Sequence, residues 1–177
     1  VKAGITDIGI ITGPHKEQLI STVGNGSRWN SKITYIEQES PLGLAHAVKI
    51  SRDFIGEEDF VMYLGDNLLN DDLTEFVTNF QNSNADASIL LTPVKDPSNF
   101  GVAKLNKKGE IIQLQEKPKK PMSNLAVVGI YAFRKSIFKA IEHIRPSARG
   151  ELEITDAIQW LVKHSYKVKS ELVEGWW

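Results

Sequence analysis

The sequence contains no cysteine, which excludes a disulfide framework and metal sites built on thiolates. It also lacks an excess of either charge, because 21 Lys and Arg residues face 22 Asp and Glu residues for a formal net charge of −1. Such a chain has no broad basic field for a phosphate backbone, so nucleic-acid binding is disfavoured. No apolar run approaches the ~20 residues that a membrane span requires. We therefore expect a cytoplasmic protein that acts on neither nucleic acid nor membrane.

The length and composition are those of an ordinary globular chain. The 177 residues are 41% hydrophobic and 24% charged, enough to bury one sizeable core. No repeat, low-complexity tract or linker marks a boundary, so we expect one domain over residues 1–177. The opening Val1-Lys2-Ala3-Gly4 has neither an initiator Met nor a signal-peptide pattern, which indicates an interior segment or a processed end.

Short apolar runs alternate with helical patterns along the chain, and this alternation predicts an α/β fold. Strands are expected at 8–12, 33–37, 60–64, 87–94, 125–133 and 167–173, and helices at 16–23, 44–55, 73–80, 137–144 and 154–162. Residues 102–105 and 111–115 flank Asn106-Lys107-Lys108-Gly109, the composition of an antiparallel hairpin. The remaining strands are expected to form a mostly parallel sheet with flanking helices. Any ligand crevice should then lie beyond the carboxyl ends of the strands.

Asp66 is the most informative carboxylate, because it follows the apolar run 61–64 and so would stand at that crevice. Mg2+ is usually held by one or two carboxylates together with substrate phosphates. An Asx turn or a helix cap is the alternative for an Asp in this place. The nearby Asp71-Asp72 is more simply explained as an N-terminal helix cap.

The segment from Gln38 to Ala45 joins a strand to a helix through a Pro-x-Gly turn. Such a turn lets the backbone approach a flat ligand, and the Gln38 amide could hydrogen-bond a nucleobase edge. A plain turn capped by Ser40 is the alternative.

Two later segments carry charged groups at the expected sheet end. In Glu116-Lys117-Pro118 the lysine could hold a phosphate and the carboxylate could accept bonds from sugar hydroxyls, although Glu-Lys neighbours are common solvated pairs. In the segment 149–156 the acidic residues of the first helical turn are explained by the helix dipole. Only Glu151, before that turn, indicates a further role.

Other signatures are missing. Gly24-Asn25-Gly26 lacks the third glycine of a dinucleotide fingerprint and is interpreted as a helix stop. The four histidines show no ligand spacing, and neither a Gly-x-Ser-x-Gly elbow nor a P-loop is present.

Taken together and in order, several blocks closely resemble the glucose-1-phosphate thymidylyltransferases, a family of sugar-1-phosphate nucleotidyltransferases. They cover nearly the whole chain and comprise Gly24 to Trp29, Gln38 to Ala47, Leu64 to Asn67, Phe100 to Val102, Glu116 to Pro118, Ser123 to Tyr131 and Arg149 to Asp156. The Arg-Gly-Glu-Leu-Glu-Ile-Thr-Asp block is the most specific of them.

The resemblance implies a Rossmann-like fold and an enzyme that joins glucose 1-phosphate to dTTP with Mg2+ and releases pyrophosphate. It implies the following roles: thymine binding by Gln38 and Gly43, metal binding by Asp66, sugar binding by Glu116 and phosphate binding by Lys117, with Gly101, Val127, Tyr131 and Glu151 lining the sugar pocket. Family members are often homo-oligomers.

The chain departs from the family pattern at both ends. The family's opening Gly-rich loop has no match, and its later Asp-Thr-Gly segment, with a second metal ligand, does not follow Glu174-Gly175-Trp176-Trp177. We therefore expect the 177 residues alone to be inactive. A uridylyltransferase, an adenylyltransferase and a non-catalytic sugar-nucleotide sensor or assembly module remain alternatives.

Overall fold

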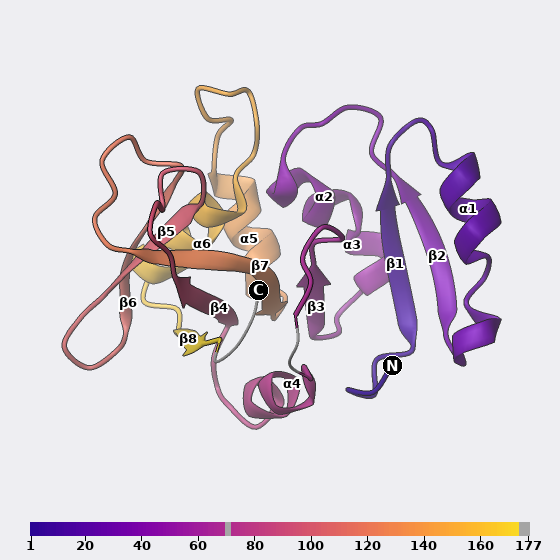
Figure 1. Ribbon diagram of the computed structural model, residues 1–177, viewed down its shortest axis with the longest axis horizontal. Helices are drawn as coiled ribbons and strands as arrows, with labels where there is room; N and C mark the ends of the chain where they lie inside the picture. Colours follow the sequence, from indigo (N-terminus) through magenta and orange to yellow (C-terminus); the bar gives the residue numbers. More distant parts are fainter. Residues whose placement is uncertain (70–71, 174–177) are drawn as a thin grey trace.

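A computed structural model describes residues 1–69 and 72–173 and shows strands and helices intermixed along the chain (Figure 1). Its strands are β1 (Asp7–Thr12), β2 (Lys32–Glu37), β3 (Phe60–Tyr63), β4 (Ala87–Pro93), β5 (Gly101–Leu105), β6 (Ile111–Glu116), β7 (Leu125–Phe133) and β8 (Val168–Leu172). Its helices are α1 (Glu17–Val23), α2 (Leu44–Ile50), α3 (Arg52–Ile55), α4 (Thr74–Gln81), α5 (Ser136–His143) and α6 (Ile154–Lys163), with a 3-10 turn at Ser27–Trp29. The expected elements are confirmed, apart from that turn and the division of the 44–55 helix at Ser51.

The strands form two sheets. One consists of β1 and β2, which run parallel, and the other has the order β6-β5-β7-β4-β8, with β3 also paired to β7. The α/β class with flanking helices is confirmed, but the large sheet is not mostly parallel. Among the described strands, β4 and β8 are the one pair that runs parallel there, while β7 runs antiparallel to β3, β4 and β5. An apolar run buried on both faces does not reveal the direction of its neighbours, so periodicity alone could not predict this mixture.

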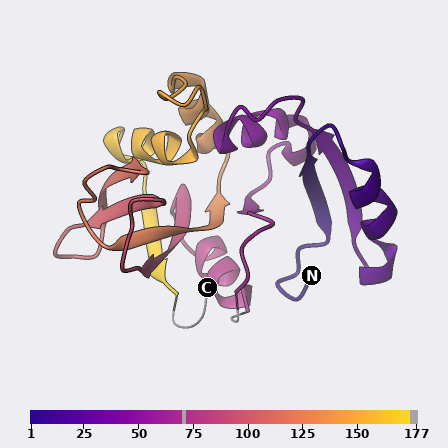
Figure 2. The ribbon, with the colours of Figure 1, turned by 45° about the horizontal axis from the view of Figure 1, so that its top comes forward.

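Helices cover both faces of the large sheet, as Figure 2 shows for α2, α5 and α6 above it and α4 below. Successive side chains of a strand point to opposite faces. Accordingly, Ile89 and Leu91 of β4 pack with α5 and α6, whereas Leu90 between them packs with α4. The central strands β4 and β7 are therefore buried on both faces and are mostly apolar, with Ser88 and Thr92 as buried polar residues of β4.

The pairing of β7 divides the sheet near its middle. β4 follows one edge of β7 from Leu125 to Phe133, with an irregularity between Ile89 and Leu91 of β4. The other edge is shared, because β5 pairs near Ala126 and β3 pairs from Ile130 onward. The separation of β5 and β3 leaves the middle of β7 between them, and the candidate site is built around this point.

In the described part of the chain, no helix is long and apolar enough to cross a lipid bilayer.

Candidate functional site

Gln38 lies directly after β2 and fastens the loop that leads to α2. Its backbone N–H donates to the carbonyl of Thr12 at 2.8 Å, which continues the β1–β2 pairing by one residue. Its side-chain Nε2 lies 3.2 Å from the Gly43 carbonyl oxygen and 2.9 Å from Nδ1 of His46. The amide therefore ties both ends of the loop together through its Nε2.

Gly43 has the backbone conformation that the Pro-x-Gly turn predicted. Its φ is +97°, and a Cβ at this position would lie 2.5 Å from the carbonyl oxygen of Leu152 and 3.0 Å from Cβ of Glu151. The backbone of Leu152 donates to the Leu42 carbonyl at 2.8 Å and accepts from Ala45 at 3.0 Å. The proposed base loop and the loop before α6 are thus joined by backbone hydrogen bonds, and only glycine fits between them.

Glu116, at the end of β6, is a partly buried carboxylate. The hydroxyl of Thr155 donates to its Oε2 at 3.1 Å, and Nη2 of Arg149 lies 3.6 Å from its Oε1. Burial raises the pKa of Glu116 above its ordinary value, and the neighbouring Glu153 adds to the rise, while Thr155, Arg149 and Lys117 oppose it. A carboxylate in this setting accepts hydrogen bonds but is costly to leave without donors.

Gly101, Val127 and Tyr131 surround this carboxylate. A Cβ on Gly101 would lie 3.4 Å from Glu116 Oε2 and 3.5 Å from Cβ of Val127. Tyr131 is buried and stacks on Phe133, and its pKa lies above its usual range because of burial first and the charge of Glu116 second. The predicted sugar-pocket residues Gly101, Glu116 and Val127 are therefore brought together, with Tyr131 in electrostatic range.

Lys117 is exposed and has an unusual backbone. Its φ is +37°, in the region that residues other than glycine rarely occupy. Its N–H donates to the Phe100 carbonyl at 3.0 Å, and the following Pro118 is buried. A strained conformation held by its surroundings is frequent in residues that contact ligands. The bend turns the chain out of β6 directly after Glu116.

Asp66 lies in the exposed loop after β3, on the β3 side of the division in the sheet. Its Oδ1 accepts from Nδ2 of Asn67 at 2.9 Å, and Oδ1 of Asn67 accepts from the backbone of Gly129 at 3.3 Å. This contact requires glycine at position 129, because a Cβ there would lie only 2.6 Å from the Asn67 side-chain amide nitrogen. Asp66 is therefore positioned over the middle of β7, but no contact between described side chains joins it to Glu116 or Lys117.

The remaining acidic predictions have simpler outcomes. Oδ1 of Asp72 accepts from the backbone and the hydroxyl of Thr74 at 2.9 and 2.6 Å, which confirms its role at the start of α4 and lowers its pKa. Asp71 lies outside the described residues. Within residues 1–69 and 72–173, no three acidic or histidine side chains form a group that could hold a metal ion by themselves.

Sequence reasoning missed three residues of this site. Arg149 reaches Glu116 and Glu151, Thr155 donates to Glu116, and Glu153 is buried against Arg149. The helix dipole had accounted for Glu153 in the sequence. The spacing of Arg149 and Glu153, four residues apart, was the available signal, but this spacing is common on solvated helices.

Comparison with known proteins identifies the family. The family model described as nucleotidyl transferase matches residues 1–177, and the chain belongs to this family. It is 49% identical over 175 residues to a glucose-1-phosphate thymidylyltransferase of Streptomyces griseus, covering 99% of this chain and 49% of that protein. The chain thus spans about half the length of this curated relative.

Solved structures share the fold. A Bacillus anthracis protein provisionally assigned as glucose-1-phosphate thymidylyltransferase, in complex with a sucrose, has a TM-score of 0.91 at 41% identity, over 99% of this chain and 71% of that one. A UDP-glucose pyrophosphorylase complexed with UDP-glucose has a TM-score of 0.86 at 25% identity, over 99% and 75%. The Rossmann-like fold implied by the sequence is confirmed.

Proposed function

We propose that this chain is part of an enzyme that transfers a nucleotidyl group from dTTP to glucose 1-phosphate, giving dTDP-glucose and pyrophosphate. The observation that carries the proposal is the junction of two loops beside a carboxylate. The loop of Gln38 and Gly43 is hydrogen-bonded to the loop of Glu151 and Leu152, and the latter loop adjoins Glu116. A base held by the first loop and a sugar held beside Glu116 would therefore occupy neighbouring sites, as the two ends of a nucleoside diphosphate sugar require.

The reaction needs positioning rather than a side-chain nucleophile. A phosphate oxygen of the sugar phosphate attacks the α-phosphorus in line, a new P–O bond forms, and the bond to the bridging oxygen breaks as pyrophosphate leaves with its electron pair. Lys117, exposed at the end of β6, would attract the sugar phosphate, while Glu116 accepts from sugar hydroxyls. The sugar phosphate and the nucleoside triphosphate, two anions that repel each other, are thereby brought together.

Mg2+ is the proposed cofactor, with Asp66 as its ligand from this chain. The residues fit such a role, because Asp66 presents an exposed carboxylate that Asn67 orients, and Mg2+ commonly takes one carboxylate plus substrate phosphates and water. The bound cation would offset negative charge on the phosphates.

UTP is the second candidate nucleotide. The Oε1 of Gln38 suits the imide N–H that thymine and uracil share, so this contact does not separate the two bases. The similarity to a UDP-glucose pyrophosphorylase over 99% of this chain gives the alternative a specific basis.

The test is a pyrophosphate-release assay on the protein expressed from its complete natural gene, with dTTP, UTP and ATP compared at equal concentration. We expect the highest rate with dTTP, and a preference for UTP would favour the uridylyltransferase. Asp66→Asn and Lys117→Ala should each lower turnover by about a hundredfold or more. Asp53→Asn and Lys119→Ala, which change exposed residues of the same types, serve as controls. Binding of dTDP-glucose without turnover of any nucleotide would favour a non-catalytic module.

A further inference from the structure

Glu153 is a buried carboxylate that the start of α6 does not explain. Its side chain is 5% exposed, and a buried charge requires partners. It occupies the N-cap position of α6 yet makes no capping hydrogen bond with its side chain. Asp156 already places an acidic group in the first turn, where it complements the helix dipole. The burial of Glu153 therefore has another cause.

The carboxylate is turned toward the preceding loop. Its Oε1 accepts from the hydroxyl of Ser147 at 2.7 Å and from Nε of Arg149 at 3.1 Å. Nη2 of Arg149 donates to both carboxylate oxygens, at 3.0 and 2.9 Å. These bonds raise the pKa of Arg149 and hold its planar guanidinium in one orientation.

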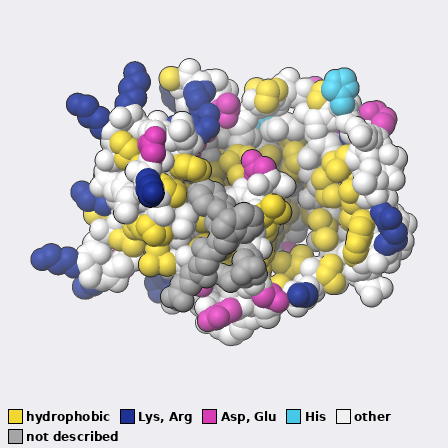
Figure 3. All heavy atoms as spheres, viewed as in Figure 1, with side chains coloured by type: hydrophobic (Ala, Val, Ile, Leu, Met, Phe, Trp, Pro, Cys, Tyr) yellow, Lys and Arg dark blue, Asp and Glu magenta, His cyan; other side chains and the backbone are white. Residues whose placement is uncertain are grey.

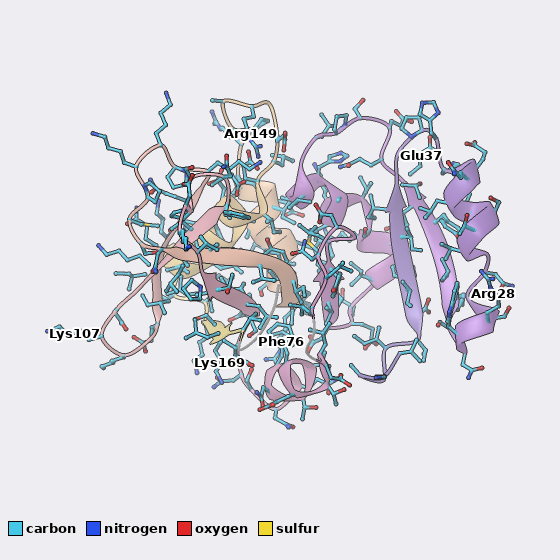
Figure 4. All side chains as sticks on the ribbon, in the orientation of Figure 1. Arg28, Glu37, Phe76, Lys107, Arg149 and Lys169 are labelled. Carbon is cyan, nitrogen blue, oxygen red and sulfur yellow. The ribbon has the colours of Figure 1, made fainter. Side chains whose placement is uncertain are left out.

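The same guanidinium faces the proposed sugar site. Its Nη2 lies 3.6 Å from Glu116 Oε1 and 3.3 Å from Glu151 Oε2. Figure 4 shows Arg149 in the loop before α6, at the end of the molecule where the loop before α2 also lies. Glu153 is the most buried of the three carboxylates around this nitrogen and makes the shortest contacts with it.

Without Glu153, the position of Arg149 would be poorly defined. An arginine side chain has many rotamers, and fixing it in one of them costs conformational entropy. The Arg149 side chain is 39% exposed, and ion pairs in that setting contribute little to stability by themselves. Among the described side chains, Thr155 would then be the one hydrogen-bond partner that orients Glu116, through one of its two oxygens.

We propose that Glu153 is a positioning residue of the sugar 1-phosphate site, which holds the Arg149 guanidinium beside Glu116 and so keeps that carboxylate in one orientation toward a sugar hydroxyl. The inference rests on the proposed function. It assigns to Glu153 an effect on the sugar substrate alone, because the backbone bonds of Leu152 to Leu42 and Ala45 secure the base loop without this carboxylate.

The test is steady-state kinetics of Glu153→Gln in the complete protein, with glucose 1-phosphate and dTTP varied separately. The glutamine keeps the volume and loses the charge. We expect KM for glucose 1-phosphate to rise about tenfold, with KM for dTTP and kcat changed by no more than about threefold. Asp156→Asn is the matched control, since it removes a partly buried carboxylate three residues along the same helix and should change neither KM.

Ser147→Ala provides a milder variant, which removes the hydroxyl that donates to Glu153 and accepts from the Arg149 backbone, and it should raise the same KM by about threefold. Ser147→Ala replaces Glu153→Gln as the test variant if Glu153→Gln does not fold. A parallel rise in both KM values would overturn the inference, because it would indicate a general structural role, and so would unchanged kinetics. Failure of the proposed function has a different signature: the parent protein itself then shows no binding of glucose 1-phosphate in calorimetry, and the inference fails with it.

Discussion

The β1–β2 sheet and the β7-centred sheet differ in how much apolar surface they bury. All of β7 beyond Leu125 is buried, whereas β2 and α1 contain no buried residue and β1 contains only Thr12. Figure 3 shows hydrophobic side chains visible over β1 and β2, to the right of the central hollow. A two-stranded sheet is marginally stable by itself, so this part depends on its contacts with the rest of the chain.

One of those contacts is visible at Gly9. A Cβ at this position of β1 would lie 2.8 Å from the ring of Phe54 in α3, so the ring packs directly on the strand backbone. The two sheets, though both apolar in sequence, are therefore expected to contribute unequally to stability. Four measurements test this difference.

The largest effect is expected from truncating one core residue in each region. Ile158 in α6 is fully buried, and Ile158→Ala should lower the free energy of unfolding by about 3 kcal/mol or more. Ile10 in β1 is only partly buried, so Ile10→Ala should cost about 1 kcal/mol. Urea unfolding followed by circular dichroism gives both values. Equal losses would show that the two regions are equally well packed.

A substitution at the junction of the two loops should have the next largest effect. Gly43→Ala introduces a Cβ at φ +97° and 2.5 Å from a backbone oxygen, so we expect a loss of about 2 kcal/mol in thermal unfolding. Gly13→Ala is the control, because nothing lies within 4 Å of its Cβ position, and it should change stability by less than about 0.5 kcal/mol. Similar melting temperatures for both variants would refute the close approach of the two loops.

Amide hydrogen exchange compares the regions without mutation. The amides of β1 and β2 should exchange at least about tenfold faster than those of β7, because few buried side chains must be exposed to open them. Mass spectrometry of peptides from 7–37 and 125–133 measures this directly. Equal protection would mean that both sheets open only in global unfolding.

The smallest effect concerns the polar cluster of the better-packed region. The pKa of Glu116 in the folded protein lies above its ordinary value of 4.5, so the folded state favours the protonated carboxyl. The stability that the folded state gains from protonating Glu116 is complete when the pH is below the ordinary pKa. It is lost as the pH rises through the raised pKa. The stability of Glu116→Gln relative to the parent should therefore increase from about pH 4 to about pH 7. A difference that stays constant or moves in the opposite direction would show that the carboxylate is well compensated when charged.

Much of the fold was predictable from local patterns. The alternation of apolar runs with helical stretches located most elements, and Asn106-Lys107-Lys108-Gly109 predicted the hairpin between β5 and β6. Gly24 ends α1 as expected, with a φ of +71°. The directions of β3, β4 and β7 were not predictable, because residues buried on both faces have the same composition in either direction.

Sequence analysis named individual candidate residues but not their arrangement, and the roles of these residues stay predictions. Gly43 and Glu116 were considered from their local motifs and again from the resemblance, and Gly101 from the resemblance alone; the structure brings Gly101 and Glu116 together. Arg149 and Glu153 were missed, since an acidic residue at a helix start has an ordinary explanation in the dipole. Their pairing is evident only when burial and hydrogen bonds are known.

The family and the α/β class could be recognised from the sequence, which also named the polar residues expected at the strand ends. Those properties depend on local patterning and on the order of motifs, which can be recognised without knowledge of long-range contacts. Three features became evident only in three dimensions: β5 and β3 share one edge of β7, the loops of Gly43 and Leu152 are hydrogen-bonded, and Arg149 is held by Glu153. The reason is that these contacts join segments far apart in the chain, and their formation depends on packing that no local pattern specifies.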